Sequence, residues 1–106
     1  MDETVRPALA ELRHGLEQLY GERLRGLYLF GSRARGDAQP DSDVDVLVVL
    51  DRVESLYREL DRTGYVSAPL CLRYGLVISR KFVAEEDWLH RDTLFLRRVR
   101  EEAIAA

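Results

Sequence analysis

The sequence predicts an α/β protein in which helices pack against a sheet of three strands. Three observations lead to this fold class. Residues 44–50 form a nearly continuous apolar run, which is typical of a strand buried on both faces. Residues 27–30 form a second, shorter apolar run that ends at a glycine. Longer segments around these runs repeat their apolar residues every three or four positions, as amphipathic helices do.

The first helix is expected over residues 4–22. Pro7 falls in its first turn, where proline is tolerated because the first amides of a helix lack partners within it. Gly21 is the expected stop signal. The spacing of three and four is kept by Val5, Leu9, Leu12, Leu16, Leu19 and Tyr20. Residues 27–30 then form the first strand, a short helix begins at Ser32, and residues 44–50 form the second strand.

The next helix follows the second strand, and we expect Asp51 to cap it. Helical spacing runs over residues 56–74 in constant phase through Gly64 and Pro69, so we expect one helix that can kink at Pro69 and ends at Gly75.

The third strand is expected over residues 76–83. Arg80 and Lys81 within it predict an edge strand or a partly solvated one. Helical segments follow from residue 84 onward, with Trp88 covering the sheet. The tail over residues 101–106 has little to bury and is expected to fray. The predicted order is therefore helix, strand, short helix, strand, helix, strand, helix.

Composition and net charge indicate the general class of protein and its expected location. A chain of 106 residues with 46% hydrophobic and 33% charged residues predicts one globular domain over residues 1–106. The net charge of −3 gives no basic field, so nucleic acid is not an expected partner. The opening Met1-Asp2-Glu3 is unlike a signal peptide, and no apolar run approaches the length of a membrane span. We therefore expect a cytoplasmic protein without membrane contact.

The acids at the start of the second strand are the main candidates for a chemical site. Alternation along the strand places Asp43 and Asp45 on one face. Burial of a lone carboxylate is costly unless it is paired or binds a metal, and two neighbouring carboxylates favour a cation between them. Mg²⁺ fits, because carboxylates and phosphate oxygens are its usual ligands. The alternative is turn formation, which accounts well for Asp41 but not for an acid within a strand.

Gly31 and Ser32 form the second candidate. The first strand stops at Gly31, which permits a close backbone approach that a Cβ atom would forbid. Ser32 stands at the expected helix start, where a hydroxyl can cap the helix or face a phosphate. Arg33 and Arg35 follow within the same turn. A strand, a Gly-Ser turn and a helix start are compatible with phosphate binding, although an ordinary turn has the same pattern.

Together these residues read G-S-x10-D-x-D, because ten residues separate Ser32 from Asp43. The pattern resembles the signature of the DNA polymerase β-like nucleotidyltransferases, and most closely the minimal nucleotidyltransferase domains that pair with HEPN-domain toxins. The neighbouring Ala34-Arg35-Gly36 and Asp41-Ser42-Asp43 match the same family. A weaker match covers residues 74–79 and 85–88. The resemblance spans most of the chain, and its specific part is residues 30–45.

The resemblance implies an α/β nucleotidyltransferase fold with a small mixed sheet. It also implies Mg²⁺-dependent transfer of AMP from ATP, at a two-metal site in which Asp43 and Asp45 hold the metals and are catalytic. The nucleotide would be bound by Gly31, Ser32, Arg33 and Arg35. The implied acceptor is a tyrosine hydroxyl of a HEPN toxin, which would make this protein an antitoxin.

One part of the family pattern is missing from the third strand. The superfamily normally carries a third carboxylate on a later strand, but residues 76–83 include no Asp or Glu. Glu85, Glu86 and Asp61 are acids near that segment, and whether one of them supplies the third carboxylate stays open. A second interpretation therefore stays open too. In it, a nucleotidyltransferase fold with weak or no activity neutralises its partner by binding.

Overall fold

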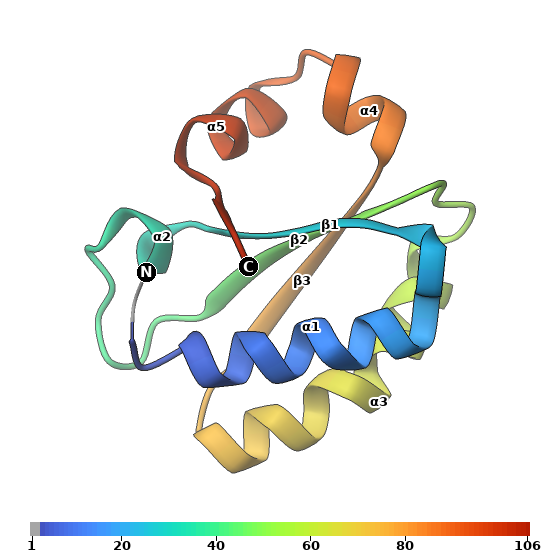
Figure 1. The fold of residues 1–106 in the computed structure, drawn as a ribbon. Helices are drawn as coiled ribbons and strands as arrows, with labels where there is room; N and C mark the ends of the chain where they lie inside the picture. Colours follow the sequence, from blue (N-terminus) through green and yellow to red (C-terminus); the bar gives the residue numbers. More distant parts are fainter. Residues whose placement is uncertain (1–2) are drawn as a thin grey trace.

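The computed structural model describes residues 3–106 and shows the predicted order of elements with three differences. A short 3-10 helix follows the first helix, the last helical region consists of two helices where one was predicted, and a fourth strand follows them. Met1 and Asp2, part of the opening that is unlike a signal peptide, lie outside the described residues. Figure 1 shows the elements in chain order: α1 (Arg6–Tyr20), η1 (Gly21–Arg23), β1 (Leu24–Phe30), α2 (Ser32–Arg35), β2 (Val44–Leu50), α3 (Leu56–Tyr74), β3 (Ile78–Ala84), α4 (Glu85–His90), α5 (Leu94–Glu102) and β4 (Ile104–Ala105).

The sheet is mixed, with the strand order β3-β2-β1-β4. β1 is antiparallel to both β2 and β4, whereas β2 and β3 are parallel. The long helix α3 makes the crossover that two parallel strands require. Because of these directions, the end of β1 and the starts of β2 and β3 meet at one end of the sheet. As predicted, β3 is an edge strand.

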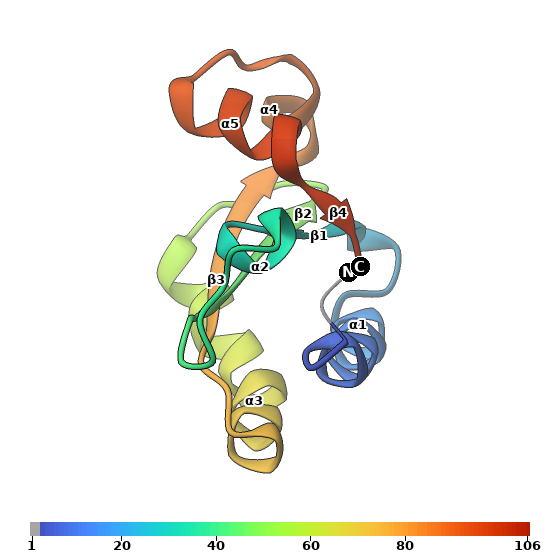
Figure 2. The same ribbon diagram turned by 90° about the vertical axis from the view of Figure 1, so that its left-hand side faces the viewer.

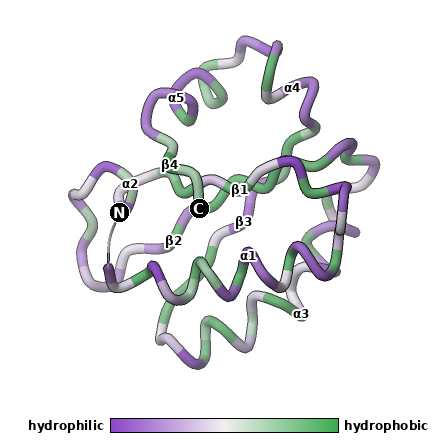
Figure 3. The backbone as a smooth tube through the Cα atoms, in the orientation of Figure 1, coloured by the Kyte–Doolittle hydropathy of each residue, from purple (hydrophilic) through white to green (hydrophobic). Residues whose placement is uncertain are grey.

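Helices cover both faces of the sheet. α1 and α3 lie on one face, and α4 and α5 lie on the other (Figure 1). β2 is apolar along most of its length (Figure 3) and is buried on both faces from Val46 to Leu50. Val46, Val48 and Leu50 contribute to the core beneath α1 and α3, whereas Leu47 and Val49 contribute to the smaller core beneath α4 and α5. Trp88 covers the second face as predicted, with its ring centroid 4.9 Å from that of Tyr28.

The prediction of three strands with a frayed tail is wrong, because residues 104–105 form a fourth strand. Ile104 pairs with Leu29, and Ala105 pairs with Tyr28. The Ala106 amide donates to the Leu27 carbonyl at 2.9 Å, and the Arg13 guanidinium donates to the Ala106 carbonyl at 2.6 Å. β4 thus covers the outer edge of β1. Backbone hydrogen bonds hold β4 against β1. Two residues are too few to show the alternating side-chain pattern that would predict a strand.

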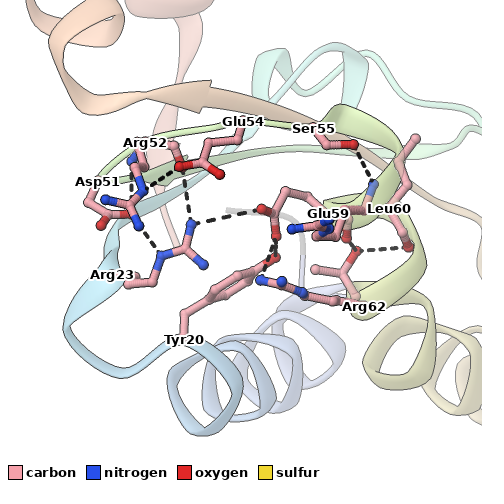
Figure 4. Close-up of polar contacts among 11 residues, drawn as sticks. Tyr20, Arg23, Asp51, Arg52, Glu54, Ser55, Glu59, Leu60 and Arg62 are labelled. Atoms are coloured by element: carbon pink, nitrogen blue, oxygen red, sulfur yellow. Dashed lines mark hydrogen bonds and ion pairs between the residues drawn. The ribbon is translucent and has the colours of Figure 1, made fainter.

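α3 is one helix through Gly64 and Pro69, as predicted, but its cap is Ser55 and not Asp51. The Ser55 hydroxyl accepts a hydrogen bond from the Arg58 amide at 3.3 Å. Asp51 accepts instead from the Arg23 guanidinium at 2.9 Å and from the amide of Arg52 at 2.8 Å (Figure 4). The carboxylate of Asp51 therefore fixes the loop after β2, and α3 begins five residues later.

A buried polar cluster lies beside this loop, at the end of the sheet where β1 begins and β2 ends. The Glu59 carboxylate is 3% exposed and accepts a hydrogen bond from the Tyr20 hydroxyl at 2.7 Å. Arg23 and Arg62 lie 3.8 and 3.6 Å from its oxygens (Figure 4). Burial and the neighbouring Glu59 raise the pKa of Tyr20. The cluster joins α1 to α3, far along the strands from Asp43.

Candidate active site

The residues predicted to carry the chemistry meet at the opposite end of the sheet. β1 ends at Phe30 and β2 begins at Val44, and these two strands pair through Phe30 and Asp45. Figure 2 faces this end of the molecule and shows α2 and the loop after it lying between the two helical layers. The sequence neighbours Gly31 and Ser32 are thus brought next to Asp43 and Asp45, although ten residues separate the two pairs.

Gly31 makes the closest contact in this site. Its φ of 76° belongs to the region that side-chain-bearing residues rarely adopt. A Cβ atom built on Gly31 would lie 2.4 Å from Asp45 Oδ2. Glycine is therefore required twice, once by the turn and once by the carboxylate that lies against it.

The two aspartates differ in exposure. Asp43 is exposed, just before β2, whereas Asp45 is partly buried within the strand. Burial and the neighbouring Asp43 carboxylate raise the pKa of Asp45, and Lys81 acts in the opposite direction. No hydrogen bond or ion pair engages either carboxylate in the part of the chain that the structure describes. The oxygens of both side chains are therefore available to a cation.

Ser32 begins α2, a helix of four residues. The Gly31 carbonyl accepts from the amides of Ala34 and Arg35, both at 3.0 Å, which closes the turn. The hydroxyl of Ser32 has no hydrogen-bond partner among residues 3–106. It lies one residue from the contact between Gly31 and Asp45.

Arg33 is directed towards the loop that precedes β2. Its guanidinium donates to the carbonyls of Pro40 and Ser42, at 3.2 and 3.0 Å, and to the Thr4 hydroxyl at 3.3 Å. The residue is 5% exposed. The family resemblance predicted Arg33 at the phosphates, whereas its guanidinium fixes the backbone next to Asp43 in the structure.

Arg35 is exposed and joins α2 to the end of α5. Its guanidinium lies 2.7 Å from Glu102 Oε2 and 3.3 Å from Asp37 Oδ2. A hollow of about 400 Å³ beside this ion pair is lined by Arg35, Arg98, Glu101 and Glu102. Sequence reasoning missed Glu102, because the expectation of a frayed tail left no reason to place it near the acid pair.

The sequence left open whether Glu85, Glu86 or Asp61 supplies a third carboxylate, and the structure places none of them here. Glu85 and Glu86 follow the far end of β3, where Glu85 lies 3.5 Å from Arg25. Asp61 is exposed on α3, which packs on the other face of the sheet. Within residues 3–106, no three His, Cys, Asp or Glu side chains are grouped so that they could hold a metal ion.

The side chains that do accompany Asp45 on the next strand are Ser79 and Lys81. In the parallel ladder Asp45 pairs with Ser79, and Leu47 pairs with Lys81. Both β3 residues project on the face of the sheet that carries Asp45. The alternation of the third strand already placed Ser79 and Lys81 on a common face, but only the register of the sheet shows that this face is the one with the acids.

An α/β fold that brings a Gly-Ser turn against an Asp-x-Asp strand defines the class of protein. The sequence model of the family described as "Nucleotidyltransferase domain" matches residues 9–105. The chain belongs to this family and is an enzyme of the nucleotidyltransferase type. The resemblance to minimal nucleotidyltransferases of the polymerase β superfamily is thus confirmed, whereas pairing with a HEPN toxin stays a prediction.

Two relatives of similar sequence agree with this family. The chain is 37% identical over 76 residues to "Protein adenylyltransferase MntA" of Thermococcus cleftensis, covering 72% of this chain and 75% of that protein. It is 34% identical over 94 residues to a "Putative protein adenylyltransferase" of Methanocaldococcus jannaschii, covering 82% and 88%. A crystal structure of a putative nucleotidyltransferase from Sulfolobus solfataricus superposes with a TM-score of 0.49 at 17% identity, covering 96% of this chain and 84% of that one.

None of the helices in residues 3–106 has the length and apolar character that crossing a bilayer requires.

Proposed function

We propose that this chain transfers AMP from ATP to a hydroxyl group of a protein. The observation that carries the proposal is the contact of Asp45 Oδ2 with the Gly31 turn, which places the acid pair against the turn predicted to bind phosphate. The names of two relatives support a protein as the acceptor, because both are called protein adenylyltransferases.

The acid pair fits a magnesium ion. Two carboxylates without protein partners, one of them partly buried and with a raised pKa, offer the oxygen donors that Mg²⁺ prefers. Asp43 and Asp45 would hold the ion. A Mg²⁺ ion bound there would neutralise negative charge on the triphosphate.

The other residues would act on the nucleotide or on the site itself. The Ser32 hydroxyl can donate to a phosphate oxygen, and Gly31 leaves room for that phosphate beside Asp45. Arg35 supplies a cation at the same turn when the triphosphate competes with Glu102 for it. We assign Arg33 a positioning role, because its guanidinium fixes the loop that carries Asp43.

In the transfer, the acceptor oxygen would form a bond to the α-phosphorus while the bond from that phosphorus to the bridging oxygen breaks. Pyrophosphate leaves with the electron pair, and the proton of the acceptor hydroxyl passes to solvent. Residues 3–106 offer no grouped third carboxylate as a base, so we expect the transfer to be slow.

We further propose that the acceptor is a tyrosine of a small helical toxin of the HEPN type and that the modification silences it, so that the chain acts as an antitoxin. This part follows from the sequence resemblance. We place the reaction in the cytoplasm, where ATP is abundant.

The test uses the intact chain with ATP, Mg²⁺ and a purified small helical protein of the HEPN type as the candidate acceptor. The intact mass of that protein should rise by one AMP group per modified site, and tandem mass spectrometry should locate the group on tyrosine. Asp43→Asn should abolish the change, whereas the neighbouring Asp41→Asn should not, because Asp41 lies in the turn before Asp43 and is not one of the two acids proposed to hold the ion.

A second function is favoured by one observation, the absence of a grouped third carboxylate among the described residues. In that case the chain neutralises its partner by binding alone. The partner would then lose its activity without any change in mass, and Asp43→Asn would neutralise it as well as the wild type does. That result would refute the enzymatic proposal.

A further inference from the structure

The strand beside the acid pair carries a cation where a second metal ion would need acidic ligands. On the face of β3 shared with Asp45, Ser79 lies directly across the ladder, and Lys81 lies one position further along the same face. Mg²⁺ in such sites is usually held by one or two carboxylates together with substrate phosphates, so a second ion would need a carboxylate beyond the pair Asp43 and Asp45. Ser79 brings no charge to that site, and Lys81 brings one of the same sign as a metal.

Lys81 is well placed to act as a cation there. It is exposed on the edge strand and is the only lysine in the sequence. Its ammonium group has no hydrogen bond or ion pair within the described residues 3–106. It nevertheless acts on the site, because its charge opposes the rise in the pKa of Asp45.

The remaining carboxylate near the site is already engaged. Glu102 is close enough to raise the pKa of Asp45, but its Oε2 lies 2.7 Å from the Arg35 guanidinium. The described residues around Asp45 thus supply two unpaired carboxylates and one unpaired ammonium group. This set suits one divalent ion, since a second would be repelled by Lys81 without an acid to hold it.

We propose that this active site holds one Mg²⁺ ion, bound by Asp43 and Asp45, and that the Lys81 ammonium replaces the second metal ion by contacting the triphosphate. The inference rests on the nucleotide site of the proposed function. It adds Lys81 to that site and departs from the two-metal arrangement expected from the sequence.

The first test counts metal ions. The chain is saturated with Mn²⁺ and a non-hydrolysable ATP analogue, and the Mn²⁺ and nucleotide that remain with it on ultrafiltration are measured. We expect one Mn²⁺ per bound nucleotide in the wild type. In the double variant Ser79→Asp/Lys81→Ala, which supplies the missing acid and removes the cation, we expect two. Two Mn²⁺ ions per nucleotide in the wild type would overturn the inference while leaving the proposed function intact.

The second test isolates Lys81 by measuring the Kd of the Mn²⁺–analogue complex. Lys81→Ala should raise this Kd about tenfold, as expected for the loss of one contact between an ammonium group and a phosphate. Lys81→Arg should restore most of the affinity, and the melting temperature should stay unchanged because Lys81 is exposed.

Arg58→Ala is the control for a lost surface cation, since Arg58 is exposed on α3, on the other face of the sheet. It should leave the Kd unchanged. An unchanged Kd in Lys81→Ala would overturn the role of Lys81. A wild type that retains neither Mn²⁺ nor nucleotide would overturn the proposed function together with this inference.

Discussion

At the scale of single residues, the contact between Gly31 and Asp45 decides how close the acid pair lies to the turn. The Gly31 turn has a positive φ, and the missing Cβ atom leaves the space that Asp45 Oδ2 occupies. Gly36, five residues later, also has a positive φ, but nothing lies within 4 Å of the position of its absent Cβ atom. A side chain at Gly36 would therefore cause backbone strain alone, whereas a side chain at Gly31 would cause both backbone strain and a clash.

We predict that Gly31→Ala is the more damaging of the two substitutions. Gly36→Ala should cost about 1–2 kcal/mol of unfolding free energy, the usual price of a left-handed residue with a side chain. Gly31→Ala adds a clash with Asp45 and should cost clearly more, with loss of Mg²⁺-dependent nucleotide binding. Urea unfolding and nucleotide titration of both variants measure this. Equal losses in both would show that Gly31 matters only for its backbone.

Substitution of Asp45, unlike substitution of the glycines, should stabilise the fold when no metal ion is bound. The folded-state pKa of Asp45 is raised, so its ionised form disfavours folding. In EDTA at pH 7, Asp45→Asn should therefore raise the melting temperature. The gain should be absent below the ordinary pKa of 3.8 and should appear as the pH rises through the raised value. Mg²⁺ should reverse the order by stabilising the wild type alone. A lower melting temperature in EDTA at pH 7 would mean that the Asp45 carboxylate stabilises the fold.

At the scale of elements, β4 has the largest unpredicted effect. It is only two residues long, yet it covers the free edge of β1 and follows directly after the helix that carries Glu102. The central apolar strand and the long helix α3 were predictable because each repeats its pattern over seven or more residues. Ile104 and Ala105 give no such repeat, and their strand exists because β1 has unpaired backbone groups there.

Deletion of residues 104–106 should destabilise the chain by about 2–3 kcal/mol, since a few backbone hydrogen bonds and a partly buried Ile104 are lost. Hydrogen exchange should accelerate mainly in β1, and the exposed edge should promote association between chains. Chemical unfolding, exchange mass spectrometry and size-exclusion chromatography follow these effects. Ala106→Gly is the matched control, because it keeps the backbone that pairs with Leu27. Unchanged exchange in β1 would mean that β4 does not protect that edge.

The caps illustrate why sequence alone placed some residues wrongly. Asp51 and Ser55 are both residue types that favour helix starts, and both precede the same apolar repeat. Asp51 does not cap the helix because its carboxylate accepts a hydrogen bond from Arg23. Arg23 lies next to Asp51 only once β1 and β2 have paired. The same holds for Lys81 and Arg33, whose neighbours are set by the register of the sheet and by the path of the loop.

At the scale of the whole molecule, the two ends of the sheet differ in whether their charged side chains have protein partners. The end with Glu59, Tyr20 and Arg23 is a closed polar cluster whose groups satisfy one another. The end with Gly31 and Asp45 leaves its carboxylates without protein partners in the described structure. The sequence predicted that Gly31 and Asp45 meet at this end, because the two flanking strands are recognisable as apolar runs. It did not predict the polar cluster at the other end, since Glu59 looks like an ordinary helix residue.

Glu59→Ala should therefore lower stability without changing the chemistry. Removal of one partner from a buried charged cluster costs about 3–5 kcal/mol, and the Tyr20 hydroxyl loses its acceptor. The nucleotide affinity of the folded fraction, measured well below the melting temperature, should equal that of the wild type. The exposed Glu54→Ala, on the adjoining loop, should change neither quantity by much. A change in nucleotide affinity in Glu59→Ala would mean that the two ends of the sheet are coupled.

The central claim is that the end of the sheet with Gly31 and Asp45 binds ATP together with a divalent ion. Calorimetric titration of Mg²⁺–ATP into the wild type and into the double variant Asp43→Asn/Asp45→Asn tests it most directly, with the exposed Asp41→Asn as the control. We predict saturable binding to the wild type and to the control, and no detectable binding to the double variant. Equal binding by the wild type and the double variant would contradict the account.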